Sequence, residues 1–239
     1  MDVTRLTPRI TMFTFTAGQA YALRRPDGDW TLVDTGLRGH GRAILSALSE
    51  LSAEGGRLRD IFLTHSHGDH TGSAAELAAL TGARVLAGAA DADVIRGTAP
   101  EPPPVLEDWE VPIIESVHAR LGDTVQAPPC RVDVELTDGD TLDWGEEATA
   151  VHIPGHTAGS MALHLPASGV LFTGDTIANA PELGGVILGV FNVDREQALS
   201  SFRKQAELPG LEVACFGHGA PVVGGAGEAL REAVARTGR

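Results

Sequence analysis

Lysine, tyrosine and cysteine are scarce in this chain of 239 residues. It contains one lysine, Lys204, one tyrosine, Tyr21, and two cysteines, Cys130 and Cys215. The two cysteines are far apart in the sequence, so they form no Cys-x-x-Cys metal motif and no disulfide framework. This cysteine usage favours a reducing compartment, and we therefore expect a cytoplasmic protein.

Positive charge is also in short supply. The chain has 18 basic against 32 acidic residues, and its formal net charge is −14. Nucleic acids and anionic membrane surfaces are bound by basic surfaces, so the composition argues against both partners. No apolar run reaches membrane-spanning length, and residues 1–18 lack the pattern of a secretory leader. A small-molecule substrate is the expected partner. The sequence leaves the oligomeric state open, a homodimer included.

The length and the apolar fraction of 43 % predict one large α/β domain over residues 1–239. The pattern predicts strands within residues 8–35 and a glycine-rich loop at residues 178–193. Further strands are predicted at residues 60–63, 83–86, 131–136, 147–153, 161–165, 169–172 and 212–216, and helices at residues 42–50, 73–80, 195–206 and 227–236. This order favours helices packed on sheets.

A proline-rich insert at residues 97–129 interrupts the regular pattern. Four prolines occur within residues 100–104, two more close the segment at 128–129, and a helix is predicted at 107–121 between them. Such an insert is either a surface excursion or a lid over a site. Its apolar content favours substrate contacts from Trp109 and Ile113. For His118 an exposed helix position is the plainer explanation, and substrate contact is the alternative.

The segment Thr64–Gly72 holds the strongest chemical signal. Three of the nine histidines, His65, His67 and His70, fall within six residues together with Asp69. The segment follows an apolar run and precedes a helical pattern. Imidazole and carboxylate groups are ligands that suit zinc, and also manganese or iron. Packing alone rarely calls for four ligand-type side chains in one strand-to-helix turn, so we predict a metal site.

Three later strands each end in a ligand-type residue beside glycine: His156, Asp175 and His218. Because α/β sheets present their sites at the carboxyl ends of strands, we expect these residues to join the first cluster. Asp34, in the sequence Asp34-Thr35-Gly36, also ends a strand. It predicts either turn closure or a supporting position beside the metal ligands.

These ordered motifs resemble those of the metallo-β-lactamase-fold hydrolase superfamily, and the resemblance covers nearly the whole chain. It implies an α/β fold, specifically a four-layer αββα sandwich. It assigns His65, His67 and His156 to one metal, Asp69, His70 and His218 to a second, and Asp175 to both. Asp69 would be catalytic, and Asp34, Thr64 and Thr157 would support the ligands.

The resemblance further implies two divalent metal ions, zinc first, with manganese or iron as alternatives. A hydroxide held by the dinuclear centre would cleave a small ester, thioester or lactone. An aspartate at 175 fits glyoxalase II-like thioesterases and lactonases, and differs from β-lactamases proper. Glyoxalase II carries a helical C-terminal domain for glutathione, which we do not expect after His218. The lactonases use a tyrosine in the second half, where this chain has none.

Two other functions remain open at this point. Persulfide dioxygenases share much of the motif set and use one iron, for which His65, His156 and Asp175 are the matching residues. A binding or regulatory domain with a vestigial metal site is the third hypothesis. The presence of all seven ligand-type residues makes it the weakest.

Overall fold

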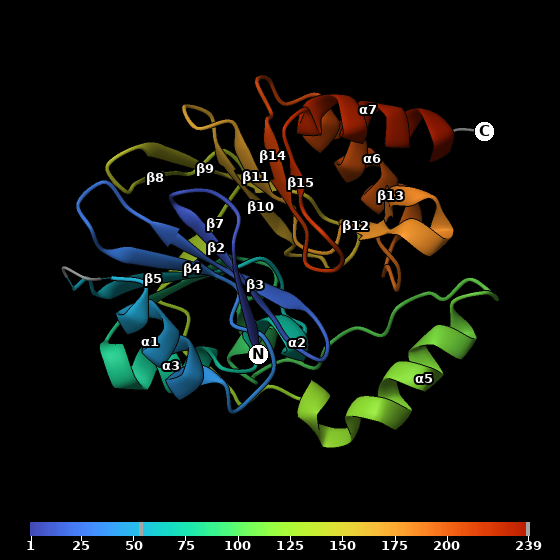
Figure 1. Cartoon of the computed structure of the whole chain (residues 1–239). Coiled ribbons are helices and arrows are strands. Elements are labelled where there is room, and N and C mark those ends of the chain that lie inside the picture. The colour runs from blue at the N-terminus through green and yellow to red at the C-terminus, as the bar shows by residue number, and fades with distance from the viewer. Residues whose placement is uncertain (53–54, 238–239) are drawn as a thin grey trace.

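Two β-sheets face each other, and helices cover the outer face of each (Figure 1). The computed structural model describes residues 1–52 and 55–237. The first sheet has the order β1 (Asp2–Arg5), β2 (Ile10–Thr14), β3 (Gln19–Arg24), β4 (Trp30–Val33), β5 (Leu58–Leu63), β6 (Arg84–Gly88) and β7 (Val134–Leu136). Its outer face packs against α1 (Gly41–Glu50), α3 (Ala74–Thr81) and α4 (Ala92–Ile95).

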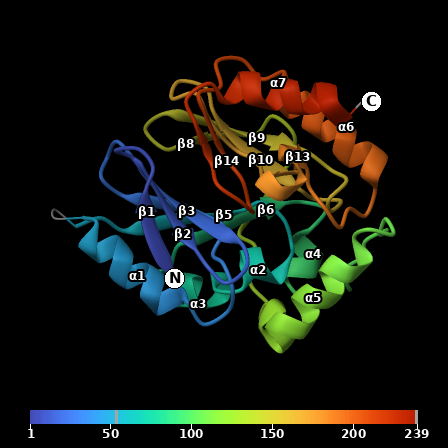
Figure 2. The same cartoon turned by 45° about the vertical axis from the view of Figure 1, so that its right-hand side comes forward.

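The second sheet is formed by the later part of the chain. Its order is β15 (Val222–Val223), β14 (Val213–Cys215), β11 (Val170–Phe172), β10 (Met161–Leu165), β9 (Glu147–His152) and β8 (Thr141–Asp143). Its outer face packs against α6 (Arg195–Ala206) and α7 (Ala226–Thr237), as Figure 2 also shows. The predicted four-layer αββα sandwich is confirmed.

The alternation of side chains along β5 explains why this strand lies between two cores. Ile61 and Leu63 point to the helices of the first layer, whereas Phe62 points to the core between the sheets. Successive residues of a strand face opposite sides, so a strand covered on both faces is apolar throughout. The apolar run 61–63 therefore marks a central strand.

Parallel pairing brings the carboxyl ends of several strands to one edge. β4 pairs in parallel with β5, and β5 with β6. In the second sheet β11 pairs in parallel with β14. The short helix α2 (Gly68–Thr71) begins five residues after β5 ends. Asp34, the turn of His65 to His70, Asp175 and His218 follow β4, β5, β11 and β14, whereas His156 follows β9.

The predicted glycine-rich loop at residues 178–193 is wrong over much of its length. The structure has a hairpin of β12 (Ile177–Ala180) and β13 (Gly185–Leu188), joined through the short helix η2 (Pro181–Leu183). Val186 and Leu188 alternate into the core beneath α6 and α7. Gly184 and Gly185 have φ of 101° and 96°, a conformation that glycine adopts without strain. The glycines therefore make the turn of a hairpin.

The insert carries α5 (Val111–Leu121) and the short helix η1 (Gly122–Val125). α5 stands at the periphery, on the same side of the molecule as the β12–β13 hairpin in both views (Figures 1 and 2). The predicted helix at 107–121 thus starts later, with Pro112 in its first turn. The Val105 amide donates to the Asn192 carbonyl over 2.9 Å, and the Phe191 amide donates to Glu110 Oε1 over 3.1 Å. The insert is therefore held against the segment that follows β13.

No helix in the described part of the chain combines the length and the apolar content needed to cross a membrane.

Candidate metal centre

The seven residues predicted as ligands lie together at one edge of the sandwich. They come from four turns that are distant in sequence. Four of them, His65, His67, Asp69 and His70, lie between the end of β5 and the end of α2. The other three follow strands of the second sheet: His156 after β9, Asp175 after β11 and His218 after β14.

Three imidazoles form a first cluster. His67 Nδ1 lies 3.0 Å from His65 Nε2 and 3.0 Å from His156 Nε2. Burial lowers the pKa of His156 to about 3 and holds the pKa of His65 well below its ordinary value. Both rings are therefore neutral at pH 7 and keep a lone pair. Three imidazole nitrogens around one point match the three protein ligands of a zinc site with an open position.

Asp69, His70 and His218 form a second cluster. Asp69 Oδ2 lies 3.2 Å from His218 Nε2 and 3.7 Å from His70 Nε2. Asp175 faces both clusters: its Oδ1 is 3.3 Å from His70 Nε2, and its Oδ2 is 3.2 Å from His218 Nε2. The same Oδ2 is 3.7 Å from His156 Nε2. Asp175 therefore occupies the place between the clusters.

The charge balance of the second cluster fits cations. Burial raises the pKa of Asp69 and of Asp175, but the charges of His70 and His218 outweigh it, and both pKa values lie below normal. In turn, burial lowers the pKa of His218, but Asp175 and Asp69 outweigh this effect and raise it to about 10. Buried ionised carboxylates require positive charge close by. Divalent cations at this place would supply that charge instead of the protons of His70 and His218, whose release leaves each ring a lone pair for a cation.

Two further observations show that the donors are aimed at a shared space. His70 Nε2 and Asp175 Oδ1 are buried and have no hydrogen-bond partner within residues 1–52 and 55–237. A Cβ at Gly217 would lie 1.9 Å from Asp175 Oδ1 and 2.7 Å from His70 Cε1. Any side chain at Gly217 would therefore fill the space between the donors. The residues present fit two divalent cations.

Asp34 and Thr64 contact the imidazole rings of two predicted ligands, His70 and His65. Asp34 has φ of 61°, a strained conformation for a residue other than glycine. Its Oδ2 lies 2.9 Å from His70 Nδ1 and accepts a hydrogen bond from Thr64 Oγ1 over 2.8 Å. Thr64 Oγ1 is also 3.0 Å from His65 Nδ1. Outer partners of this kind fix the orientation of ligand imidazoles.

Asp91, which the sequence motifs did not reveal, contacts two of the turns that carry the predicted ligands. Its buried carboxylate accepts hydrogen bonds from the Ser66 amide over 3.0 Å and from the Gly159 amide over 2.7 Å. It also accepts one from the hydroxyl of Thr157 over 2.6 Å. Asp91 therefore joins the turn of His65 and His67 to the turn of His156. The one signal in the sequence was its position shortly after a strand.

Tyr21 was also missed as part of the site. The side chain is buried between the sheets, and its hydroxyl donates to the Phe216 carbonyl over 2.6 Å. Phe216 directly precedes Gly217 and His218, so the bond fixes the start of that ligand turn. Burial raises the pKa of Tyr21 well above its ordinary value.

The insert touches the ligand turn at both of its ends. Glu101 Oε1 lies 3.6 Å from His67 Nε2. A Cβ at Gly68 would lie 1.7 Å from the Val125 carbonyl oxygen, so the chain returns closely over this turn. By contrast, Trp109, Ile113 and His118 all have exposed side chains. Their contact with substrate stays a prediction, as does the action of the insert as a lid.

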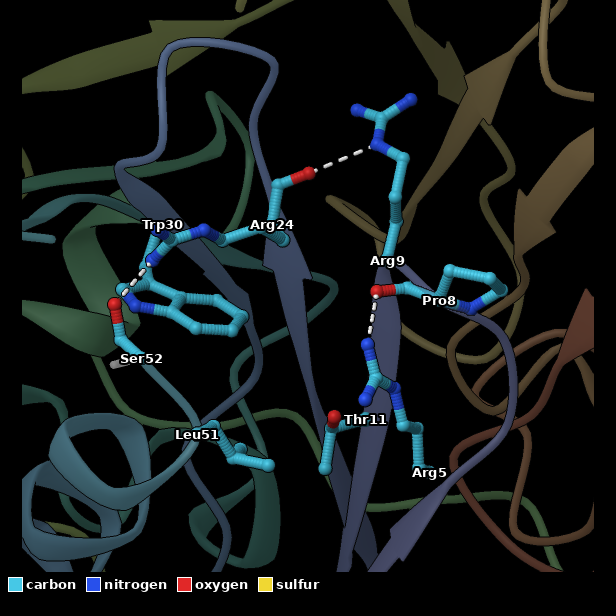
Figure 3. A pocket seen from close by; sticks show the side chains of 8 residues that line it. All are labelled: Arg5, Pro8, Arg9, Thr11, Arg24, Trp30, Leu51 and Ser52. Carbon is cyan, nitrogen blue, oxygen red and sulfur yellow. Dashed lines mark hydrogen bonds between the residues drawn. The ribbon is translucent and has the colours of Figure 1, made fainter. Parts of the chain in front are cut away.

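A separate cavity of about 240 Å³ lies against β2, β3 and β4 (Figure 3). Three arginines line it together with Trp30. Trp30 is the first residue of β4 and Asp34 directly follows the last, so the cavity and the candidate metal centre lie at opposite ends of this strand. Arg5 Nη2 donates to the Pro8 carbonyl over 2.9 Å, and Arg24 Nη1 donates to Ser52 Oγ over 2.8 Å. Arg24 also lies over the Trp30 ring, 4.8 Å from its centroid. These arginines therefore connect neighbouring segments of the chain.

Sequence comparison finds relatives with a consistent name. The hydroxyacylglutathione hydrolase of Fuscovulum blasticum is 34 % identical over 172 residues, which are 72 % of this chain and 52 % of that protein. The protein of the same name from Cereibacter sphaeroides is 34 % identical over 192 residues, or 80 % of this chain and 58 % of that protein. The chain thus spans a little over half the length of these curated relatives.

Solved structures share the fold at lower identity. The BLEG-1 B3 metallo-beta-lactamase has a TM-score of 0.64 and 23 % identity, over 86 % of this chain and 88 % of that one. A metallo-beta-lactamase family protein from Thermus thermophilus has a TM-score of 0.64 and 24 % identity, over 98 % of this chain and 79 % of that one. The sequence profile of the metallo-beta-lactamase superfamily matches residues 13–218, a range that contains all seven clustered donors. With the sandwich, the ligand turns and this match in agreement, the chain belongs to the metallo-beta-lactamase superfamily.

Proposed function

We propose that the protein is a metal-dependent hydrolase of a small thioester. The observation that carries the proposal is the convergence of seven donors in two clusters with Asp175 between them. His65, His67 and His156 would hold one divalent cation, Asp69, His70 and His218 a second, and Asp175 both. Such cations, when bound, lower the pKa of water towards neutrality and polarise a carbonyl oxygen.

Asp69 has the properties of the group that orients the attacking water. Its Oδ2 lies on the inner side of the second cluster, 3.2 Å from His218 Nε2. Because the pKa of Asp69 lies below its ordinary value, the carboxylate is ionised at neutral pH and can accept a hydrogen bond from a water molecule. The position of its helix, α2, is fixed by the Thr35 amide, which donates to the His70 carbonyl over 2.7 Å.

The two cysteines and the tyrosine do not offer a covalent route. Burial raises the pKa of Cys130 to about 11, and it raises the pKa of Cys215 still further. Both thiols therefore stay protonated at pH 7, where a thiol is a poor nucleophile. The hydroxyl of Tyr21 is committed to the Phe216 carbonyl. Without a strong general acid, a leaving group that departs as an anion is favoured, and a thiolate is such a group.

The relatives narrow the choice among the candidate reactions. Those described above are named as hydrolases of hydroxyacylglutathione, which is a thioester. This name does not favour the iron-dependent oxidation that the same ligands would allow. Because the chain spans a little over half of these relatives, the thiol part of the substrate is not carried over with the name. We propose a thioester with a small acyl group. A panel of thioesters distinguishes glutathione from a short neutral thiol as the thiol part of the substrate.

A substrate panel with a matched variant tests the function. Wild-type protein and Asp69→Ala are loaded with zinc and assayed on thioesters of glutathione and of a short neutral thiol, on aryl esters and on lactones. We expect thioester hydrolysis by the wild type, its loss on chelation and its recovery with zinc or manganese. Asp69→Ala should lower kcat by at least about 100-fold, as loss of an orienting group does.

The control for this experiment is Glu115→Ala, which removes one exposed carboxylate from α5 and should leave kcat unchanged. Hydrolysis that survives both chelation and the loss of Asp69 would mean that the centre is not the catalyst. One iron per chain by elemental analysis, with oxygen uptake on a thiol substrate, would contradict the proposed hydrolase and support the iron-dependent oxidoreductase.

A further inference from the structure

His67 differs from the other imidazoles of the first cluster in the atom that it turns inward. His65 and His156 both present Nε2 to the cluster, whereas His67 presents Nδ1. The Nε2 atom of His67 is therefore on the outer side of the ring. An imidazole that gives one nitrogen to a cation carries its proton on the other, and this N–H needs an acceptor.

The outer nitrogens of two other predicted ligands, His65 and His70, already have partners, which directly follow β5 and β4. His65 Nδ1 lies 3.0 Å from Thr64 Oγ1, and His70 Nδ1 lies 2.9 Å from Asp34 Oδ2. The His67 side chain is 23 % exposed, compared with 1 % for His65 and 2 % for His156. The outer nitrogen of His67 is therefore the one in this cluster that water can reach.

The carboxylate that faces this nitrogen comes from the insert. Glu101 Oε1 lies 3.6 Å from His67 Nε2, an electrostatic contact longer than a hydrogen bond. The hydroxyl of Ser66, the residue between the two histidines, donates to the same Oε1 over 3.1 Å. A cation at Nδ1 polarises the Nε2–H bond and so strengthens its attraction to a carboxylate on the far side of the ring.

The backbone of the insert limits where Glu101 can go. Pro100 and Pro102 flank it, and each fixes its own φ near −65°. A little further on, the Val105 amide is bonded to the Asn192 carbonyl over 2.9 Å, and Glu110 accepts the Phe191 amide. Glu101 thus belongs to a stiff segment that is anchored on the residues following β13.

From these contacts we propose that Glu101 is a positioning residue for His67, and that the proline-rich insert is a structural part of the metal centre. Glu101 attracts the outer N–H of His67 electrostatically and so keeps its Nδ1 directed at the cluster. The inference rests on the proposed metal centre, but it concerns how tightly the cation is held, so its test needs no substrate.

Zinc affinity measured by competition with a chromophoric chelator tests this role. Glu101→Ala should weaken the tighter zinc site by 10- to 100-fold, the range typical for loss of an outer partner. Glu101→Gln, which keeps an acceptor oxygen without the charge, should fall between Glu101→Ala and the wild type. The unfolding midpoint of the metal-free protein should be the same in all three, because Glu101 has an exposed side chain.

The matched control is Glu115→Ala, which removes an exposed carboxylate from the same insert and should bind zinc as the wild type does. Equal zinc affinity in Glu101→Ala and the wild type would overturn the inference. An equal loss in Glu115→Ala would also overturn it, because the effect would then be that of net charge. Failure of the wild type to bind any divalent cation would overturn the proposed metal centre itself.

Discussion

Asp60 shows how single residues stabilise this fold far from the metal centre. Its carboxylate is fully buried at the end of β5 remote from the ligand turn. It accepts hydrogen bonds from the guanidinium groups of Arg25 and Arg84, and from Trp144 Nε1 over 2.7 Å. Burial raises the pKa of Asp60, but Arg84 and Arg25 outweigh this effect, and the pKa lies below its ordinary value.

The pH dependence of stability should report this carboxylate. Asp60→Asn should lower the free energy of unfolding at pH 7 by roughly 3 kcal/mol, because it leaves the buried Arg25 without its counter-charge. A lowered folded pKa means that the stabilisation is present above the unfolded value of about 3.9 and is lost as the pH falls through the folded value. Urea unfolding of both proteins between pH 7 and pH 3 measures it, and the difference should shrink below about pH 4.

The control for this series is Asp2→Asn, at an exposed position of β1, which should match the wild type at every pH. A difference between Asp60→Asn and the wild type that is as large at pH 3 as at pH 7 would contradict the charge-based explanation.

The clustering of the seven candidate ligands could be predicted from the sequence, whereas several of the residues that contact them could not. The four donors of the first turn lie within six residues, and the other three stand beside glycine at strand ends, so composition and spacing identify them. Asp91, Tyr21 and Glu101 act through contacts with residues far away in the sequence, such as the Phe216 carbonyl for Tyr21. Nothing in their local sequence distinguishes them from an ordinary strand or loop residue.

Among the elements, the turns after β5 and β9 depend on Asp91 for their relative position. Asp91→Ala would leave the buried amides of Ser66 and Gly159 without their acceptor, and each such loss costs about 1–3 kcal/mol. We expect a lower free energy of unfolding in urea. Zinc affinity should fall as well, because His67 and His156 would lose their common anchor.

Asp93→Ala is the control for this variant, because Asp93 lies on α4, the short helix that Asp91 directly precedes, and has an exposed side chain. A variant Asp91→Ala that is less stable but binds zinc as tightly as the wild type would show that Asp91 serves the fold alone.

The β12–β13 hairpin shows why an element near the site was harder to predict than the central strands. Glycine at 184 and 185 suggested a loop, yet the burial of Val186 and Leu188 by α6 and α7 stabilises a strand. That burial depends on helices that come later in the chain. Tertiary packing therefore decided the structure of a segment whose local sequence favours a turn.

For the whole molecule, the four layers follow from the alternation of apolar residues, and cations should add stability to them. The ligands come from both sheets, so a cation that binds the folded state alone stabilises it by about 2.7 kcal/mol at 100 times its Kd. We expect chelation to lower the unfolding midpoint, and Asp175→Ala to bind at least one metal fewer by elemental analysis. Full occupancy by two metals in Asp175→Ala would refute the bridging role.

Because the donors are divided between the two sheets, the two halves of the chain are constrained to evolve together. The turn at residues 137–140 separates the strands of the first sheet from those of the second. Neither side of that turn has a complete cluster, because His156 completes the first and His218 the second. A half taken from another sequence would have to match the geometry of the half it joins. Recombination between distant family members at this turn is therefore constrained by the placement of single nitrogen and oxygen atoms as well as by the packing of the sheets.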